Sequence, residues 1–521
     1  MSISTGLPGA AARVRRLPQN WPVIGIASAV ALLSLIPLGF IVAVALAAGP
    51  TEVGRLLFRP RVGELLLNSL WLELITVPVT IVLSVALAWI TEQTRLVGAR
   101  WWSAILVAPL AIPAFVQSYA WNSVLPQLHG LPGVVLIAVI SYFPFIYLPV
   151  ASQLRRLDPA LEDAAASLGK SPRQIFWKVI VPQLRLPVSA GALLVALHLL
   201  GEYGLFAMMR YDTFTTAIVD QFQSVYDGPA ANLLGGVLVL CCLALFGTEA
   251  LVRGDRRYAR LGSGAARRGE RHALGLSAAA AVALLLITVA LSLGVAAVVL
   301  GRWLWIGGGG VWLQGALWSS LAATAGLSVA GALLCTVMAM PMAWLSVRGS
   351  GRLPRWLESA HLYAGALPGL IIALALVSIT VRVMLPLYQT LATLVFAYGL
   401  MFLPRALTGL RSSMAQAPVE LERAAMTLGK SPLSAVWRTT MRLAAPGIAA
   451  SLALCALGIT NELTGTLLLA PNGVRTLATK FWALSSELDY VAAAPYALLM
   501  VILALPLTWL LRRQAERALS Q

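Results

Sequence analysis

The chain has 521 residues, of which 59% are hydrophobic and only 11% are charged. A water-soluble domain carries about 25% charged residues, so a soluble fold is excluded. The net charge of +17 would suggest a nucleic-acid partner in a soluble protein, but Lys and Arg also collect in the cytoplasmic loops of membrane proteins. We therefore expect an all-α polytopic membrane protein, surrounded by lipid and without a nucleic-acid partner.

Apolar runs long enough to cross a bilayer, which needs about 20 residues, predict about twelve transmembrane helices. The first run is too long for the core of a cleaved signal peptide, so we interpret it as an uncleaved helix. In chain order the predicted spans are 22–48, 69–91, 101–121, 130–152, 188–209, 232–252, 273–300, 317–346, 358–381, 387–410, 448–470 and 492–511.

The distribution of basic residues predicts the orientation of these spans. With both termini in the cytoplasm, 30 of the 38 Lys and Arg fall in predicted cytoplasmic segments. One of these segments is 405–447. Cytoplasmic loops carry an excess of Lys and Arg, so we expect a multi-pass protein of the inner (cytoplasmic) membrane with both ends inside. Arg55, Arg59 and Arg61 lie in an outside segment, and the sequence offers no role for them.

An internal repeat organises the chain. Residues 161–172 (LEDAAASLGKSP) recur 260 positions later as residues 421–432 (LERAAMTLGKSP), and Trp177 and Trp437 continue the match at the same separation. A separation held over some forty residues indicates duplication. Six predicted spans separate the copies, so both copies emerge on one side of the membrane and the halves are parallel repeats of six helices each. The predicted units are a first transmembrane domain at 1–252, a basic cytoplasmic linker at 253–272 and a second transmembrane domain at 273–521.

The repeated segment predicts a short helix, a tight turn and a second helix that enters the membrane. In the first copy Asp158-Pro159 places an N-cap acceptor before a proline at the first helical position, and Gly169 supplies a left-handed stop. Ser171-Pro172 then begins the next helix in the same way. The second copy repeats Gly429 and the Ser-Pro pair after it. We call these segments the first elbow (158–187) and the second elbow (418–447).

The sequence Gly-Lys-Ser in each elbow resembles the end of a phosphate-binding GxxxxGK[ST] loop. The glycine required five residues earlier is Ala164 in one copy and Ala424 in the other, and a proline follows each serine. We therefore expect no nucleotide site, no cofactor and no enzymatic activity in this chain. Any ATP is hydrolysed by a separate protein.

The two elbows resemble the EAA loop of the permease subunits of bacterial ABC importers, whose consensus is EAA, three residues, Gly and a later hydrophobic-Pro pair. The first copy matches at Ala164, Ala165, Gly169 and Pro182, with Asp163 in place of the Glu and Glu162 one position earlier. The second copy matches at Ala424, Ala425 and Gly429, with Arg423 in place of the Glu, Glu422 one position earlier and Arg442 where the first copy has Pro182. These residues are the predicted docking sites for an ATPase.

The doubled form is similar to the fused permeases of the ferric-iron importer family. The resemblance implies the fold of type I importers, ferric iron as cargo, two copies of an ABC ATPase on the elbows and a periplasmic or lipid-anchored substrate-binding protein outside. Related fused permeases import thiamine and other small solutes, so these cargoes are alternatives. A secondary transporter driven by an ion gradient is a further alternative, but it leaves the repeated elbow without a role.

Glu202 and Glu462 stand at matched positions of the two halves, inside predicted spans. Ionisable groups in a span cost about 2.5–3.5 kcal/mol on insertion scales and usually face a cavity or the bundle interior. The pair could line a cation pathway or a gate, or each could hydrogen-bond locally, with Tyr203 and Asn461 as partners. His198 stands alone in an apolar run, so we interpret it as a core or interface residue and expect no metal site.

Overall fold

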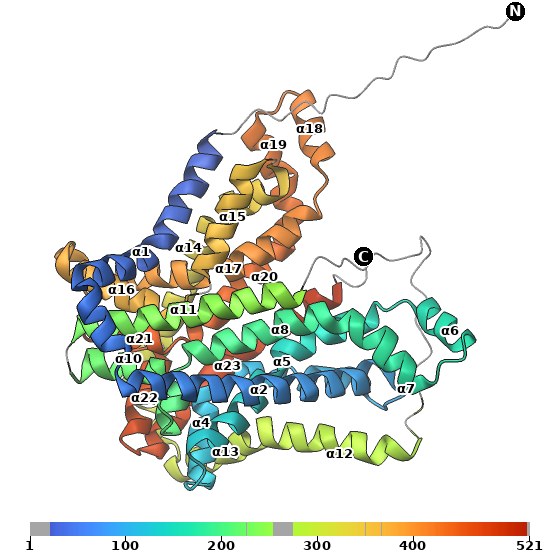
Figure 1. Ribbon diagram of the computed structural model, residues 1–521, viewed down its shortest axis with the longest axis horizontal. Helices are drawn as coiled ribbons and strands as arrows, with labels where there is room; N and C mark the ends of the chain where they lie inside the picture. Colours follow the sequence, from blue (N-terminus) through green and yellow to red (C-terminus); the bar gives the residue numbers. More distant parts are fainter. Residues whose placement is uncertain are drawn as a thin grey trace, which may run out of the picture.

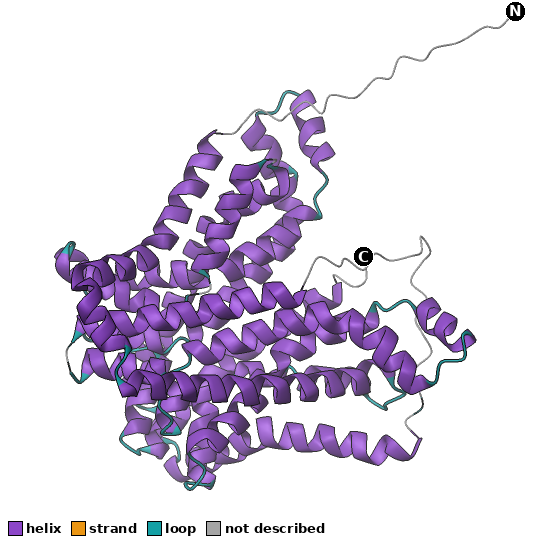
Figure 2. Cartoon of the chain, viewed as in Figure 1, coloured by secondary structure: helices purple, strands orange, loops and turns teal. Residues whose placement is uncertain are grey.

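The computed structural model describes residues 21–225, 227–253, 273, 275–349, 351–365 and 367–517. Among these residues the chain forms helices joined by short turns and contains no strand (Figure 2). The prediction of an all-α protein is confirmed. The predicted basic linker lies outside the described residues, apart from Arg253 at its start.

The first half consists of five long helices and several short ones. The long helices are α1 (Trp21–Leu57), α2 (Pro60–Gln93), α5 (Gly130–Arg155), α8 (Val181–Gly201) and α11 (Gly228–Arg253). The short helices are α3 (Ala99–Ile105), α4 (Ala114–Val124), α6 (Pro159–Ser167), α7 (Pro172–Ile175), α9 (Gly204–Met208) and α10 (Phe214–Gln223).

The second half repeats this order. Its first span runs through α12 (Ala278–Val289) and α13 (Val295–Gly307), and its other long helices are α14 (Gly315–Arg348), α17 (Leu391–Ala415), α20 (Thr440–Thr460) and α23 (Tyr490–Arg517). The short helices are α15 (Arg352–Ala364), α16 (Gly369–Arg382), α18 (Val419–Thr427), α19 (Pro432–Arg438), α21 (Thr464–Leu469) and α22 (Leu477–Ser486).

The described part of the chain has ten helices long and apolar enough to cross a membrane, or eleven if one bent pair counts as a span. This number agrees with the prediction of about twelve spans when a second divided segment, 358–381, is counted as well. The predicted span 101–121 is broken by a 92° bend just before α4, where Pro113 is the N-cap residue. The predicted span 358–381 is divided in the same way, with Pro368 as the N-cap residue of α16. Proline restricts its preceding residue to extended backbone, which ends each helix at this point.

Two arms diverge from a common base in Figure 1. One arm contains α2, α5 and α8 and ends at α6 and α7 of the first elbow. The other contains α14, α17 and α20 and ends at α18 and α19 of the second elbow, whereas α10, α16, α21 and α22 lie at the base. A membrane crossed by both arms places both elbows on one side, as parallel repeats require.

The first span of each half packs against the opposite half. α1 is kinked at Gly49 (φ 78°), and it contacts α14, α15 and α16 of the second half. In return, Ala281 and Leu285 of α12 belong to the buried cluster formed by α2, α5 and α8. The two halves are therefore interlocked, and neither buries its apolar surface alone.

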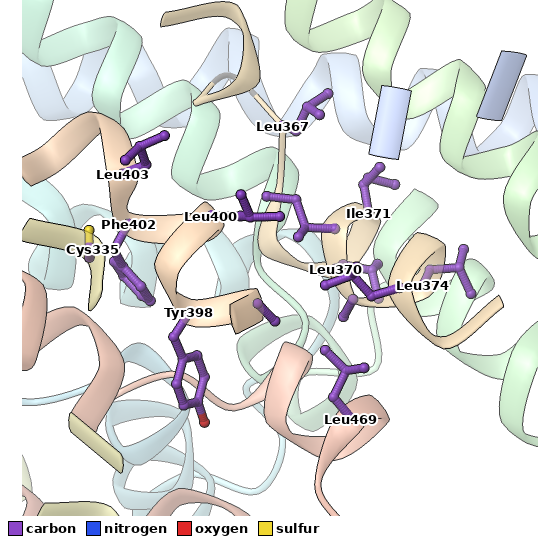
Figure 3. Packing of buried hydrophobic residues seen from close by; sticks show 14 of the residues in the cluster. Cys335, Leu367, Leu370, Ile371, Leu374, Tyr398, Leu400, Phe402, Leu403 and Leu469 are labelled. Carbon is purple, nitrogen blue, oxygen red and sulfur yellow. The ribbon is translucent and has the colours of Figure 1, made fainter. Parts of the chain in front are cut away.

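The short helix α16 forms the centre of the base. Every residue from Leu370 to Val377 is buried, as is typical of a helix that is apolar on all sides and surrounded by other helices. Figure 3 shows Leu370 and Leu374 beside Leu400 of α17 and Leu469 of α21, all members of one buried cluster.

Candidate functional site

The elbows share one backbone conformation. In the first elbow α6 ends at Ser167, Gly169 has φ 76°, and the N–H groups of Gly169 and Lys170 donate to the carbonyls of Ala166 (2.9 Å) and Ala165 (3.1 Å). This pair of hydrogen bonds is the Schellman motif, which needs a residue in the left-handed region and therefore favours glycine. The second elbow repeats both bonds: Gly429 (φ 81°) to Met426 at 3.0 Å and Lys430 to Ala425 at 3.1 Å.

Both elbows expose apolar side chains at matched positions. Leu168 and Leu428 are 79% and 81% exposed, and Trp177 and Trp437 are 68% and 67% exposed. Large apolar side chains gathered on a surface indicate a site of interaction with another molecule. Among the predicted docking residues, the exposed ones are Asp163, Ala164, Gly169, Arg423, Ala424 and Gly429, and the partly buried ones are Glu162, Pro182 and Ala425.

Glu422 and Ala165 are buried. The Glu422 carboxylate accepts hydrogen bonds from Arg348 Nε (3.2 Å) and Nη2 (3.1 Å) and from the Thr440 hydroxyl. Arg348 also donates to the carbonyl of Ala417, just before α18 (2.7 Å). Because its side chain is satisfied inside the chain, Glu422 fastens the second elbow to the end of α14. Glu422 lies in the predicted docking loop, but its side chain is not part of the exposed surface of the elbow.

The two candidate pathway glutamates lie in breaks between helices. α8 ends at Gly201 and α9 begins at Gly204, so Glu202 and Tyr203 occupy the break. α20 ends at Thr460 and α21 begins at Thr464, so Asn461 and Glu462 occupy the matching break. The continuous spans predicted at 188–209 and 448–470 are therefore wrong, and the glutamates are not inside helices.

Each glutamate caps the short helix that follows its break. Glu202 Oε1 accepts from the N–H of Leu205 at 3.1 Å, and Glu462 Oε1 accepts from the N–H of Gly465 at 2.8 Å. The first N–H groups of a helix have no partner within the helix, so a carboxylate at this position stabilises it. Thr215 and Thr466 donate to the main-chain carbonyls of Glu202 and Glu462, at 2.6 and 2.9 Å.

The side-chain partners differ from those expected. Glu202 Oε2 accepts from the hydroxyl of Tyr142 on α5 at 2.7 Å. The Tyr203 ring instead packs against Trp482 of the other half, with 5.3 Å between ring centroids, and Asn461 Oδ1 is buried without a hydrogen-bond partner. Tyr203 and Asn461 therefore do not satisfy the carboxylates.

A contact that the sequence did not indicate joins the two halves close to this point. His198 Nδ1 lies 2.9 Å from the carbonyl of Leu194, and its Nε2 lies 3.1 Å from Arg405 Nη2. The first bond requires a proton on Nδ1, so Nε2 accepts from the guanidinium. The Arg405 side chain packs closely against Gly458 of α20. A Cβ at position 458 would come within 2.7 Å of Arg405 Nη1, so only glycine fits there.

The breaks of the two halves touch at the base of the arms. A Cβ on Gly204 would come within 3.0 Å of Leu463 Cδ2, and one on Gly201 within 3.4 Å of the Pro368 Cβ. Two carboxylates, a guanidinium and an imidazole are thereby brought to the contact between the halves. Among the described residues, no three or more His, Cys, Asp or Glu side chains are grouped to hold a metal ion. The arrangement can attract a cation, but it does not form a multidentate site.

Two interlocked helical bundles, with matched elbows at their free ends and a polar contact at their base, define a double-length membrane permease. The family model for the inner membrane component of binding-protein-dependent transport systems matches residues 84–257 and again 337–519. The chain belongs to this family, the permeases of ABC importers, and carries two copies of its domain.

Named relatives agree with this assignment. The chain is 34% identical to the Fe(3+)-transport system permease protein FbpB 2 of Haemophilus influenzae over 483 residues, 92% of this chain and 96% of the relative. It is 28% identical to the sulfate transport system permease protein CysW of Synechocystis sp. over 194 residues, 33% of this chain and 70% of the relative. For the sulfate transport system permease protein CysT of Synechococcus elongatus the identity is 26% over 198 residues, 34% of this chain and 71% of the relative. Only the first of these three matches the chain along its double length.

Proposed function

We propose that this permease carries ferric iron inward across the inner membrane, with both termini in the cytoplasm, and that it is driven by two ATPase subunits bound to the elbows. The observation that carries the proposal is the pair of matched elbows, each with an exposed leucine and an exposed tryptophan at the free end of an arm. Two docking surfaces with matched exposed side chains suit two copies of one ATPase. A substrate-binding protein, periplasmic or lipid-anchored, delivers cargo at the base.

In this proposal, transport uses a movement of the two arms, which diverge from a common base. The elbows lie at the tips of separate arms, whereas the breaks of the two halves are in contact at the base. ATP-driven closure of the docked subunits brings the elbows together and separates the halves at the base. This is alternating access by rigid-body movement of packed bundles. Glu202 and Glu462 then lie at the point that opens.

Ferric iron as the cargo is supported by the double-length relative and by the charge at the base. Two carboxylates at the contact between the halves attract a cation and repel sulfate, although Arg405 offsets part of this charge. The sulfate permeases align with only about a third of this chain. Thiamine and other small solutes are the alternative cargoes.

Reconstituted transport tests this function. The permease is inserted in liposomes with its ATPase inside and the binding protein outside, and uptake of radioactive iron, sulfate and thiamine is measured with and without ATP. We expect iron uptake only when ATPase and ATP are both present. Uptake without the ATPase would identify a secondary transporter. ATP-dependent uptake of sulfate or thiamine alone would show that this solute, and not iron, is the cargo.

The pathway residues have a separate test. The double variant Glu202→Gln/Glu462→Gln keeps acceptor oxygens for the caps but removes both charges. We expect iron uptake to fall at least about tenfold while binding of the ATPase is unchanged, because a cation loses its attraction to the base. Unchanged uptake would show that the glutamates only stabilise the breaks. Thr466→Ser, which retains the hydroxyl beside Glu462, is the control.

A further inference from the structure

A cavity of about 410 Å³ lies at the base of the second half, between the first turns of α14 and the loop that precedes α22. Two cations line it, Arg475 and Lys480, together with two serines of α14, Ser319 and Ser320. Among the described residues, neither cation forms an ion pair with a carboxylate. The remaining lining residues are Ala316, Ala323, Gly473 and Val474.

The duplication shows what occupies the equivalent place in the first half. α2 and α14 are both 34 residues long, so aligning their ends pairs Arg61 with Ala316 and Glu64 with Ser319. α10 and α22 are both 10 residues long and begin after the threonine N-caps Thr213 and Thr476, so Asp212 pairs with Arg475. The loops also correspond in backbone, since Arg210 (φ 52°) and Gly473 (φ 89°) both have positive φ.

In the first half the chain satisfies this place by itself. Arg61 donates to Glu64 at 2.8 Å and to Asp212 at 2.7 Å, and Asn68 donates to the carbonyl of Asp212 at 3.0 Å. This network also gives Arg61, one of three outside arginines, a role: it holds the start of α2 against the loop after α9. One cation faces two carboxylates.

In the second half the same place has the opposite charge and lacks its central side chain. Ala316 replaces the arginine, serine replaces Glu64, and Arg475 replaces Asp212, while Lys480 adds a second cation on the first turns of α22. Two cations near each other repel, so a space between them is stabilised when an anion enters it. Guanidinium and ammonium groups with hydroxyls close by are donors that suit phosphate oxygens.

We propose that this cavity is a phosphate-binding site, in which the bound anion takes the place that Arg61 and its carboxylates occupy in the first half. The phosphate comes either from free inorganic phosphate or from the headgroup of an anionic phospholipid. Because the cavity lies at the base, away from both elbows, the ligand steadies α14 against α22 on the side where cargo enters. The proposal does not depend on which cargo is carried.

Binding to the full-length permease tests the site. The protein is freed of lipid in maltoside micelles, which contain no phosphate, and titrated calorimetrically with inorganic phosphate and, separately, with short-chain phosphatidylglycerol. We expect at least one probe to bind and the variant Arg475→Ala/Lys480→Ala to weaken it at least about tenfold, since two charge-assisted hydrogen bonds are lost. Binding of phosphate alone identifies the free anion, and binding of phosphatidylglycerol alone identifies a headgroup.

Two further variants separate a built site from general surface charge. Arg302→Ala/Arg382→Ala removes the same charge from exposed positions elsewhere and should bind like the wild type. Ala316→Arg/Ser319→Glu/Arg475→Asp copies the first-half network into the second half and should abolish binding while the protein stays folded. The proposal is overturned if neither probe binds the wild type, or if the Arg475/Lys480 variant binds as tightly as the wild type.

Discussion

The two elbows have the same backbone but are fastened to their arms differently. In the second half a buried ion pair joins Arg348, the last residue of α14, to Glu422 in α18. In the first half the last residue of α2 is Gln93, which donates to the carbonyl of Leu154 in α5 at 2.7 Å. An ion pair lies beside it, between Glu92 of α2 and Arg155 of α5 (2.7 Å).

This difference shows that duplication preserves a turn more strictly than the contacts around it. The Schellman turns depend on a few neighbouring residues, so both copies keep them. The contacts that fasten an elbow depend on residues far apart in the chain: the last residue of α14 forms an ion pair with α18, whereas the last residue of α2 donates a hydrogen bond to α5. Movement of the second elbow is therefore transmitted directly to α14.

The largest effect should come from breaking the buried ion pair between Arg348 and Glu422. Arg348→Ala leaves the Glu422 carboxylate buried with Thr440 as its remaining side-chain donor, which typically costs about 3–5 kcal/mol. We expect a lower melting temperature and loss of the coupling between ATP hydrolysis and transport. Gln93→Ala, at the matched position, removes one hydrogen bond worth about 0.5–1.5 kcal/mol. Equal effects at the two positions would contradict the difference between the elbows.

The exposed tryptophans should affect docking without affecting the fold. Trp177→Ala and Trp437→Ala each remove a side chain about two-thirds exposed, 68% and 67%, so stability should change little. If both tryptophans are central to the ATPase contact, each variant should weaken ATPase binding by about 2 kcal/mol or more, roughly thirtyfold. Co-purification and titration of the ATPase measure this. Undiminished binding in both variants would exclude the apolar faces as docking surfaces.

Substitution of the elbow glycines should have a smaller effect, through strain in the turn. Gly169→Val and Gly429→Val place a β-branched residue at φ 76° and 81°, which costs about 1–2 kcal/mol for a left-handed conformation. We expect both variants to insert in the membrane and ATPase association to fall in both, because strain in the turn displaces the docking helix that precedes it. Quantifying ATPase bound per permease compares them. Undiminished association in both variants would show that the turns take no part in docking.

The smallest effect is expected at the N-cap of the first elbow. Asp158 Oδ1 accepts from the N–H of Ala160 at 3.1 Å, and loss of such a cap costs about 1 kcal/mol. In the second elbow the N-cap residue is Pro418, which makes no side-chain cap, so Pro418→Ala removes no such hydrogen bond. Thermal unfolding of Asp158→Ala and Asp158→Asn should show that asparagine preserves stability and alanine does not. Similar losses in both variants would point to the charge instead.

Much of the elbows could be predicted because their structure is local. Asp158 caps α6, Ser171 and Ser431 cap the helices after the turns, and both glycines have positive φ, all as the residue pattern indicates. The side chain of Glu422 could not be placed from its spacing. Its partners Arg348 and Thr440 lie on other helices, so only the packing of α14, α18 and α20 reveals that it is buried.

The base was predicted in part. Matched positions identified Glu202 and Glu462, but apolar composition alone made both breaks look like continuous spans. Tyr142, the partner of Glu202, lies on a different helix and carries no sequence signal of this role. Arg405 was counted with the cytoplasmic arginines, although it lies within α17 and contacts His198 of the other half.

The sequence alone determined that the chain is a helical membrane protein built of two parallel halves, because composition, apolar run length and a repeat are properties of local order along the chain. Tertiary structure decided which charges are buried, which helices break and which half supports each first span. These features depend on contacts between residues far apart in the sequence, so the two copies differ in them. At matched places the first half has a hydrogen-bond network around Arg61, and the second half has a cavity beside Arg475.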